Sequence, residues 1–427
     1  MNILVAVEEL RAGGAQTFAL RFAQALHDAG HRVWLYTMYW QYSEDSMLRR
    51  LAPDVKFVHY QPGNQQLDML LQRTEGWLER KGLASPVRTA RLRKHLTRFL
   101  REAQIDVVSS NTFRCDELMA QALEPLPHVP LVVTMHGDYE QFLAFYRAGK
   151  EHVLPNYLPR LTRTLRRVNG IAYLSEQNLE VLKPSVLPGA NTQHLLTQRI
   201  YNGLSAAFSP QAGQRNRTAL GIPPDAFVFG MVARGVAGKG WQPLTEAYRR
   251  LRAESTRPLR LLLVGEGPAI DALRAQYAAE ADILFTGFTD NPVDYVANFD
   301  VGVLASSLRE SLPNSIAEYL FCGKPTISTD IGEVRNMLCT EEGEQAGLLI
   351  DFPNQGLTDT EQLYQAMRRY LTEPALLAKH QALAPHAFAQ FRMERCVAAY
   401  TALYQSCTHQ LASGPAARDA ANSSHQP

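Results

Sequence analysis

Two carboxylates bracket the start of a predicted helix in the second half of the chain. Glu310 lies in a loop that follows the apolar run Val301–Ala305, and Glu318 lies on the first turns of a helix that ends at Gly323. The amides between them point out of the helix N-terminus, where they have no acceptor within the helix. Exposed amides bind anionic oxygens, and carboxylates bind hydroxyls. The arrangement predicts a ligand that carries both phosphate and sugar hydroxyls.

Two cations follow an earlier predicted strand, Phe227–Ala233. Arg234 and Lys239 emerge beyond its carboxyl end in a glycine-containing loop. A guanidinium fork and an ammonium point charge could converge there on one diphosphate. A Walker A phosphate loop is excluded, because Lys239 is followed by Gly240 rather than by Ser or Thr. The alternative interpretation is a pair of exposed surface cations.

The first half of the chain places glycines and a histidine at strand ends. Gly13 and Gly14 follow the first predicted strand and let the backbone approach a ligand closely, because neither carries a Cβ. His136 follows the strand Leu131–Met135, where its imidazole can donate to a sugar hydroxyl or a carbonyl. The open alternatives are a plain tight turn and a histidine bonded to a loop carbonyl. The GxGxxG spacing and the acidic ribose clamp of a nicotinamide dehydrogenase are both missing.

Simpler explanations also exist for the two acids. The segment from Ser315 to Glu318 has the form of a capping box, in which the glutamate satisfies a backbone amide. Glu310 could be an exposed loop charge paired with Arg309. Each explanation is credible singly, but the two acids flank Pro313 at a suitable first helical position. We therefore interpret the pair as part of a binding site.

Strands and helices alternate along the chain, which predicts an α/β fold with two doubly wound parallel sheets. A linker rich in Gly, Ser, Pro and Asn, at residues 202–224, separates two series of strands. Two such units would place the carboxyl ends of their sheets across a cleft. The predicted strands are Ile3–Val7, Arg32–Tyr36, Ile105–Ser109, Leu131–Met135 and Gly170–Leu174, then Phe227–Ala233, Leu261–Val264, Ile283–Thr286, Val301–Ala305, Thr326–Thr329 and Gly347–Ile350.

These patterns predict a first domain at residues 1–203 and a second domain at residues 204–389. A tail at residues 413–427 has too little apolar content to order.

The composition of the chain excludes some classes of protein. Lys and Arg number 43 against 42 for Asp and Glu, so no overall positive electrostatic field points to nucleic-acid binding. Five scattered cysteines without a CxxC fit a reducing cytoplasm and offer no metal-like group. The start turns acidic at Glu8, unlike a signal peptide, and no apolar stretch is long enough to cross a bilayer, so we expect a cytoplasmic protein.

The segment 73–101 is strongly basic. It carries nine Lys and Arg residues, with apolar residues interleaved at near-helical spacing: Leu92, Leu96, Phe99 and Leu100. We expect peripheral contact with an anionic membrane or with a lipid diphosphate. A solvated helix face is the open alternative. The cations that could extend this surface are Arg160, Arg163, Arg166 and Arg167.

Taken in order, these motifs resemble the retaining nucleotide-sugar glycosyltransferases of GT-B type (glycosyl transferases group 1), which build bacterial surface glycans and glycolipids. The resemblance implies an acceptor-side first domain, a donor-binding second domain and a final helix, at about residues 390–410, that packs back on the first domain. The matching segments are Gly13–Gln16, His136–Gly137, Ile200–Gly203, Arg234–Gly240, Val264–Pro268, Phe285–Phe288, Glu310–Glu318 and Gly323–Pro325.

The resemblance also implies roles for single residues. His136 would bind the transferred sugar, and Arg234 and Lys239 would neutralise the leaving diphosphate. Glu310 would hold sugar hydroxyls without acting as a covalent nucleophile, and Glu318 would hold the ribose. Charge would be stabilised electrostatically, with no metal ion and no cofactor. The other donor-contacting residues would be Gly13, Gly14, Gly265, Thr286, Phe288, Ser311, Leu312, Pro313 and Asn314.

The implied partners are a nucleotide sugar and a glycan or lipid-linked acceptor. Ala233, Ser311 and Tyr319 depart from the family's usual Gly, Gly and Ala, and Ser311 leaves the identity of the sugar open. One alternative is a nucleotide-sugar epimerase on a similar frame, although its acid and base cannot be assigned here. Another is a non-catalytic sugar-nucleotide-binding protein. The chain carries every charged residue that the resemblance assigns to the site, and this argues against that alternative.

Overall fold

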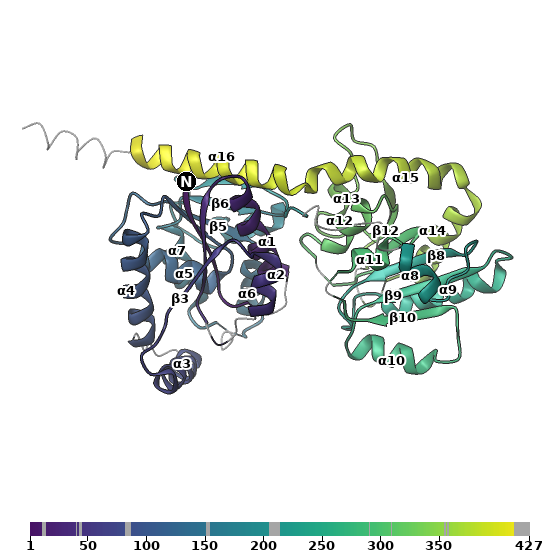
Figure 1. Cartoon of the computed structure of the whole chain (residues 1–427), viewed down its shortest axis with the longest axis horizontal. Coiled ribbons are helices and arrows are strands. Elements are labelled where there is room, and N and C mark those ends of the chain that lie inside the picture. Colours follow the sequence, from purple (N-terminus) through teal and green to yellow (C-terminus); the bar gives the residue numbers. More distant parts are fainter. Residues whose placement is uncertain are drawn as a thin grey trace, which may run out of the picture. The chain divides into compact units, whose positions relative to one another are not determined.

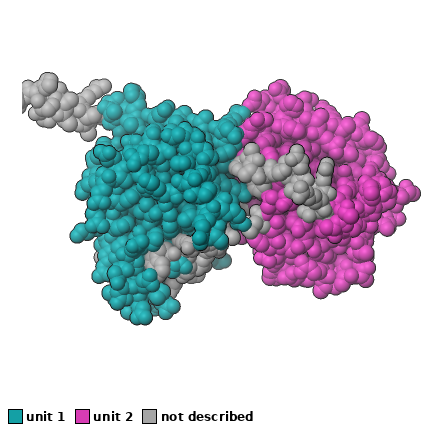
Figure 2. Space-filling model, viewed as in Figure 1, with its two compact units in different colours: residues 1–203, 393–427 teal, residues 204–392 magenta. Residues whose placement is uncertain are grey.

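The computed structural model divides into two compact units (Figures 1 and 2). The first comprises residues 1–203 and 393–427, and the second comprises residues 204–392. Each unit is built on one parallel β-sheet, so the prediction of two doubly wound α/β units is confirmed. The structure describes residues 1–10, 14–39, 41, 45–81, 87–150, 154–204, 214–289, 291–308, 310–353, 356 and 358–413.

The first unit has a seven-stranded sheet in the order β3-β2-β1-β4-β5-β6-β7. The strand order reverses between β1 and β4, which is the position where doubly wound folds bind ligands. The strands are β1 (Asn2–Val7), β2 (Arg32–Thr37), β3 (Lys56–His59), β4 (Val107–Ser110), β5 (Leu131–Met135), β6 (Gly170–Tyr173) and β7 (Leu196–Arg199). The helices are α1 (Gly14–Asp28), α2 (Asp45–Leu51), α3 (Gln65–Arg80), α4 (Val87–Glu102), α5 (Phe113–Ala122), α6 (Asp138–Arg147), α7 (Tyr157–Leu165), the 3-10 helix η3 (Glu176–Leu182) and α16 (Met393–Ser413).

Helices cover both faces of this sheet. Successive side chains of β1 point to opposite faces, so Leu4 packs in a cluster with α4 and α5, whereas Ile3 and Val5 pack in a cluster with α1 and α16. All three side chains are fully buried. This is why the strand is a continuous apolar run rather than an alternating one.

The last helix, α16, belongs to the first unit. The Tyr400 hydroxyl lies 2.9 Å from the Thr134 hydroxyl on β5, and Gln410 donates to the carbonyl of His194 over 3.0 Å. Ser413 was expected to begin a tail but is the last residue of α16, and residues 414–427 lie outside the described part of the chain. No helix within the described ranges, α16 included, is both long and apolar enough to span a membrane.

The second unit has a six-stranded sheet in the order β10-β9-β8-β11-β12-β13, with its switch point between β8 and β11. The strands are β8 (Phe227–Val232), β9 (Leu259–Val264), β10 (Ile283–Gly287), β11 (Val301–Leu304), β12 (Thr326–Thr329) and β13 (Gly347–Ile350). The helices are α8 (Gln214–Ala219), α9 (Trp241–Glu254), α10 (Pro268–Gln276), α11 (Val293–Val296), α12 (Asn314–Phe321), α13 (Val334–Met337), α14 (Thr360–Thr372), α15 (Pro374–Phe388) and the 3-10 helix η5 (Ala389–Phe391).

Two strands were not predicted. β3 and β7 are the two edge strands of the first sheet, and all of their residues are half-buried or exposed. Their sequences therefore lack the long apolar runs of the central strands, and their pairing is decided by the neighbouring strand. α8 also falls inside the segment that was predicted to be a linker.

Candidate functional site

The loops that follow β8 and β11 interlock at the switch point of the second sheet. The amide of Ser307 donates to the carbonyl of Gly238 over 2.7 Å, and the Ser307 hydroxyl donates to the same oxygen over 3.1 Å. Gly240 has a φ of +89°, and a Cβ there would lie 2.0 Å from the carbonyl oxygen of Ala305. Only glycine fits such a contact, so the two loops are held at a fixed separation.

This contact brings two of the predicted charged residues together. The Lys239 ammonium forms an ion pair with Oε1 of Glu310, and the two side chains are 11% and 15% exposed. The hydroxyl of the buried Ser306 lies 3.1 Å from the same carboxylate oxygen and accepts a bond from the amide of Leu308 over 3.2 Å. The carboxylate is therefore oriented from two sides before any ligand binds.

The backbone around Glu310 is fixed from its other side by the loop before α13. The amide of Glu333 donates to the carbonyl of Ser311 over 3.1 Å. Gly332 has a φ of +55°, and a Cβ there would lie 1.8 Å from the carbonyl oxygen of Glu310. A side chain at residue 332 would push the Glu310 loop out of its position.

Helix α12 begins at Asn314 with Pro313 as its N-cap residue and with no hydrogen bond from a capping side chain. Ser315 is thus inside the helix, and the capping-box hypothesis for Glu318 is wrong. Ser311 and Leu312 are half-buried and Asn314 is exposed. Because no side chain caps this end, its first amides can donate hydrogen bonds to an anionic group.

The other two predicted charged residues, Arg234 and Glu318, are not part of the Lys239–Glu310 ion pair. Arg234 is exposed, and its carbonyl accepts a bond from the Trp241 indole over 3.0 Å. That bond fixes the backbone of the loop and leaves the guanidinium at the surface. Glu318 is buried on α12.

The ends of β9 and β10 lie beside the end of β8. The amide of Gly265 donates to the carbonyl of Gly287 over 3.0 Å, and a Cβ on Gly265, whose φ is +149°, would lie 2.0 Å from the carbonyl oxygen of Ala233. Thr286 is half-buried, and Phe288 is 59% exposed just beyond β10. An exposed aromatic ring at the carboxyl edge of a sheet offers a stacking surface for a flat ligand ring.

In the first unit, His136 lies at the end of β5 beside the first turns of α1. Its ring centroid is 5.3 Å from that of Phe18, and Nε2 lies 3.3 Å from Oδ1 of Asn111. Burial lowers the pKa of His136 to about 4, so the imidazole is neutral at pH 7. The Asn111 amide donates to the carbonyl of Ala6 over 3.2 Å, so its Oδ1 accepts the Nε2 proton. Nδ1 is left as an acceptor.

The two predicted glycines of this unit have different outcomes. Gly14 is the first residue of α1 and is exposed. Gly13 lies outside the described residues.

Sequence reasoning missed the residues that orient the predicted ones. Ser306 holds Glu310, Asn111 fixes the tautomer of His136, and Gly332 limits the path of the Glu310 loop. Asn111 stands at the first position beyond β4, and Ser306 stands at the second position beyond β11. Polar residues just after buried strands are the signal that could have found them. Nothing local marks Gly332.

A buried acid pair lies near His136. Burial raises the pKa of Asp138 to about 7 and also raises that of Asp116. Oδ2 of Asp138 accepts a bond from the amide of Phe113 over 2.7 Å, and the hydroxyl of Tyr139 donates to Asp116 over 2.6 Å. These carboxyls fix the start of α5 and are structural in their contacts.

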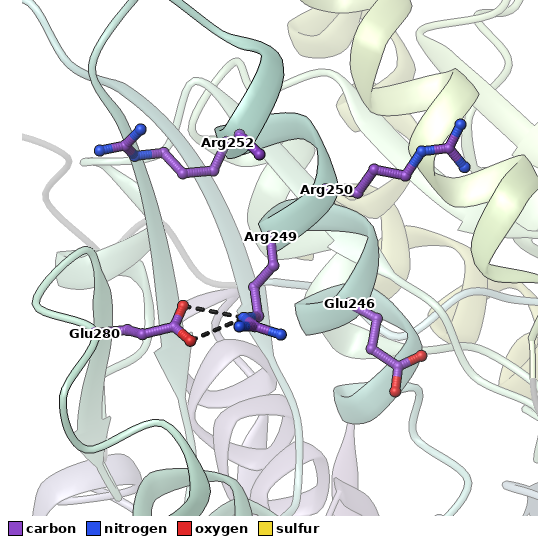
Figure 3. A pocket seen from close by; sticks show the side chains of 6 residues that line it. Glu246, Arg249, Arg250, Arg252 and Glu280 are labelled. Carbon is purple, nitrogen blue, oxygen red and sulfur yellow. Dashed lines mark hydrogen bonds and ion pairs between the residues drawn. The ribbon is translucent and has the colours of Figure 1, made fainter.

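A hollow of about 460 Å³ lies elsewhere on the second unit, along α9 (Figure 3). Arg249 pairs with Glu280 over 2.8 Å, Arg250 pairs with Glu361, and Arg252 lies 3.2 Å from Asp282. Figure 3 shows the Arg249–Glu280 contact. The residues that line the hollow are Glu246, Arg249, Arg250, Arg252, Ala253 and Glu280. The hollow carries neutralised cations and lies toward the C-terminal end of α9, whereas the Lys239 loop joins the N-terminal end.

Across the described residues, no group of three or more His, Cys, Asp and Glu side chains is arranged to hold a metal ion.

Part of the basic segment is structural. Arg88 is buried and lies 3.2 Å from Asp68, and Leu92 lies in the core. Arg160 pairs with Glu117 over 2.7 Å, and Arg167 donates to backbone carbonyls. The expectation that Arg160 and Arg167 extend a lipid-binding surface is therefore wrong. The cations of the segment whose side chains are described and exposed are Arg73, Lys81, Arg91, Arg93, Lys94, Arg98 and Arg101.

Comparison with known proteins gives matches in both units. The model of the glycosyl transferases group 1 matches residues 226–373, and that of glycosyltransferase family 4 matches residues 12–190. A Campylobacter jejuni relative is 28% identical over 36% of this chain and 39% of its own length. It is named N-acetylgalactosamine-N,N'-diacetylbacillosaminyl-diphospho-undecaprenol 4-alpha-N-acetylgalactosaminyltransferase. The lipopolysaccharide core biosynthesis glycosyltransferase LpsE of Rhizobium meliloti is 29% identical over 45% of this chain and 53% of its own length.

The chain thus spans about half or less of the length of these curated relatives. Among solved structures, Anabaena Alr3699/HepE in complex with UDP is similar over 95% of this chain and 100% of that chain, with a TM-score of 0.67 and 19% identity. Both units of the present chain fall within this likeness of fold.

Proposed function

Because this chain belongs to the GT-B glycosyltransferases, we propose that it transfers a sugar from a nucleotide-diphosphate donor to a glycan or lipid-linked acceptor. The observation that carries the proposal is the Lys239–Glu310 pair at the switch point of the second sheet. It places a cation and a hydroxyl-binding acid next to the uncapped start of α12.

The donor diphosphate is assigned to Lys239 and to the first amides of α12. The ammonium supplies a point charge, and the amides supply donors without a competing side chain. Arg234, from the same loop, has an exposed guanidinium that can reach a second phosphate oxygen. When the bond between the anomeric carbon and the diphosphate oxygen breaks, the negative charge grows on that oxygen, beside these groups.

The sugar hydroxyls are assigned to Glu310 and Ser311, the ribose to Glu318, and the base to the edge formed by Gly265, Thr286 and Phe288. Lys239 and Ser306 hold Glu310 in one orientation, which suits a hydrogen-bond acceptor better than an attacking carboxylate. His136, neutral and with Nδ1 as an acceptor, is assigned to a hydroxyl of the transferred sugar.

We extend the proposal to retention of the anomeric configuration and to independence of divalent metal. The acceptor oxygen attacks the anomeric carbon on the face that the diphosphate leaves, and the acceptor proton passes to the departing phosphate. Support comes from the orientation of Glu310 and from the cations available at the leaving oxygen. The anomeric signal of the product in an NMR spectrum and turnover in the presence of a chelator test the two parts.

The acceptor class rests on the relatives. One is named for transfer to a sugar on diphospho-undecaprenol, and the other for synthesis of the lipopolysaccharide core. We propose an acceptor of this general class, in the synthesis of cell-surface polysaccharide or glycolipid.

The first experiment is a thermal-shift panel of nucleotide sugars and nucleoside diphosphates. A bound donor at about 100 times its Kd stabilises the folded protein by about 2.7 kcal/mol. We expect one base to raise the melting temperature, and Lys239→Ala to remove most of that shift. Glu361→Gln, which breaks an exposed ion pair with Arg250, serves as the control that leaves it unchanged. A panel in which no nucleotide stabilises the protein would contradict the proposal.

Product analysis then separates the reaction classes. Transfer yields a free nucleoside diphosphate and a lengthened acceptor, whereas an epimerase yields an isomeric nucleotide sugar. Recovery of an isomerised donor without release of nucleotide would favour the epimerase.

A further inference from the structure

Helix α3, at one extremity of the first unit (Figure 1), exposes an unusual share of large apolar side chains. Leu67, Leu70 and Trp77 are 44%, 57% and 54% exposed, and Met69 is exposed as well. With Val87 at the start of α4, these are five of the nine large apolar side chains that are exposed in the described residues. A cluster of this kind marks an interaction surface.

The apolar residues of α3 form a stripe. Leu67, Leu70 and Trp77 are spaced by three and seven residues, which places them on one side of a helix. The buried Asp68 lies on the other side. The stripe therefore faces away from the unit that carries it.

All the carboxylates of α3 are engaged within the unit. Asp68 pairs with the buried Arg88, and Glu75 accepts the amide of Arg88 over 2.6 Å. Glu79 pairs with Arg114 and Arg160. The exposed side chains of α3 in the described residues therefore include no acid: Gln65, Gln66, Leu67, Met69, Leu70, Arg73, Thr74 and Trp77.

The neighbouring helix α4 carries a row of cations. Its buried side is formed by Arg88, Leu92, Leu96 and Leu100. A second set, spaced alternately by four and three residues, points the opposite way and is exposed: Val87, Arg91, Lys94, Arg98 and Arg101. The contacts of Arg88 with Asp68 and Glu75 hold α4 against α3. The two helices that expose the apolar stripe and the row of cations are therefore neighbours within the first unit.

We propose that α3 docks this stripe into the headgroup region of an anionic bilayer, while the cations of α4 bind the headgroup phosphates. Apolar and aromatic side chains beside Lys and Arg, with no exposed acid on α3, are the composition of an interfacial membrane helix. A second copy of the chain would present the same cations, and like charges would oppose that contact. An anionic lipid surface complements them.

The docked helix is linked to the site of the first unit. Glu79, on the last turn of α3, lies 3.6 Å from Arg114, the second residue of α5, which begins just after β4. Docking therefore brings the carboxyl edge of the first sheet close to the lipid surface. A lipid-linked acceptor would be presented there, although docking itself does not depend on which reaction the protein performs.

Co-sedimentation of the full chain with vesicles tests the proposal. We expect binding to vesicles of phosphatidylcholine and phosphatidylglycerol that is much weaker with phosphatidylcholine alone. Leu70→Gln with Trp77→Gln should lower the bound fraction at least tenfold. Tyr146→Gln, an exposed aromatic of α6 in the same unit, is the matched control and should leave it unchanged. Binding that survives the double substitution would overturn the proposal.

The role of the α4 cations in membrane binding is tested by comparing two pairs of charge reversals. Each cation near an anionic surface contributes a factor of roughly five, so Arg91→Glu with Lys94→Glu should reduce binding by more than tenfold and weaken its salt dependence. Arg368→Glu with Lys379→Glu makes the same change in net charge at exposed cations of the second unit. Equal losses in the two pairs would show a net-charge effect and overturn the assignment to α4.

Two further measurements separate the possible occupants. Trp77 fluorescence should shift to the blue and be quenched by brominated phosphatidylglycerol, and Trp77→Phe should remove that response. Self-association in the absence of lipid that is abolished by Leu70→Gln, without vesicle binding by the parent, would assign the stripe to a second copy and overturn the proposal. Nucleotide-induced thermal shifts should be unaffected by the α3 substitutions. The docking proposal and the proposed sugar transfer can therefore be refuted separately.

Discussion

Lys239 and Glu310 form an ion pair although 71 residues separate them in the sequence. One residue follows β8 and the other follows β11, and these strands are neighbours in the sheet. Because parallel strands deliver their carboxyl ends to one edge, two loops that are distant in the chain meet there. The pair holds the ammonium in place and fixes the orientation of the Glu310 carboxylate.

Removing either charge should reduce turnover. We expect Lys239→Ala to lower kcat/KM by roughly 10²- to 10³-fold, because one charge-stabilising group at a developing anion is worth about 2.7–4 kcal/mol. Glu310→Ala should fall in the same range. The double substitution should be only slightly worse than either single one, since the two side chains act as a unit. Release of nucleotide is the measurement.

The exposed Arg250–Glu361 pair provides the control for that series. Glu361→Gln should leave kcat/KM unchanged, since exposed pairs contribute little and this one lies away from the Lys239 loop. Single substitutions that leave nucleotide release at the parent rate would remove the roles assigned to Lys239 and Glu310.

Gly332→Ala should reduce turnover by shifting the Glu310 loop. A Cβ at Gly332 would lie 1.8 Å from the carbonyl oxygen of Glu310, so the backbone on one side must move. We expect at least a tenfold loss of kcat with the fold retained. Gly343→Ala has the same left-handed strain, with a φ of +83°, but meets nothing within 4 Å. It should lose only the stability that this strain costs and keep its activity. Equal activity in both variants would mean that the Glu310 loop tolerates the shift.

Asp138 should make stability depend on pH. Burial raises its pKa to about 7, so between about pH 4 and pH 7 the folded state binds a proton that the unfolded state has released. The free energy of unfolding contributed by this group therefore falls as pH rises through that window and levels off above it. Asp138→Asn can keep the bond from the Phe113 amide and should flatten this dependence in urea titrations. A variant with the parental slope would contradict the assignment.

Tyr400 should anchor α16 to the first unit. Its ring is fully buried beside Phe22, with centroids 4.5 Å apart, and its hydroxyl bonds to Thr134. Tyr400→Ala should destabilise the unit by about 3–5 kcal/mol through the cavity it leaves. Tyr400→Phe should cost only about 1 kcal/mol, the net value of one hydrogen bond. Urea unfolding measures both, and equal effects of the two substitutions would show that packing of the ring is not the main term.

Much of the fold could be predicted from the sequence. The central strands and the helices between them follow from local periodicity, and most predicted strands end within a residue or two of the observed ends. β3 and β7 were missed because they lie toward the sheet edges, where burial is incomplete and the pattern is weak. The end of α16 was placed too early, since its last turns carry few apolar residues.

The candidate site was predicted in its residue types but not in its contacts. Strand ends and glycine spacing identified Lys239 and Glu310, because doubly wound sheets collect functional residues at those ends. Ser306 was overlooked although it lies only four residues before Glu310, in the same loop. Gly332 was not found because only the folded chain brings it near the Glu310 loop.

The cations of the basic segment show most clearly which properties the sequence cannot determine by itself. Its composition and periodicity determined that the segment 73–101 is basic and carries apolar residues at near-helical spacing, because charge and spacing are properties of the chain itself. Only the tertiary structure decided that Arg88 forms a buried ion pair with Asp68 while Arg91 and Lys94 remain exposed. The physical reason is that a charge is neutralised by the partner that folding places within a few ångströms of it, and Asp68 comes from another helix.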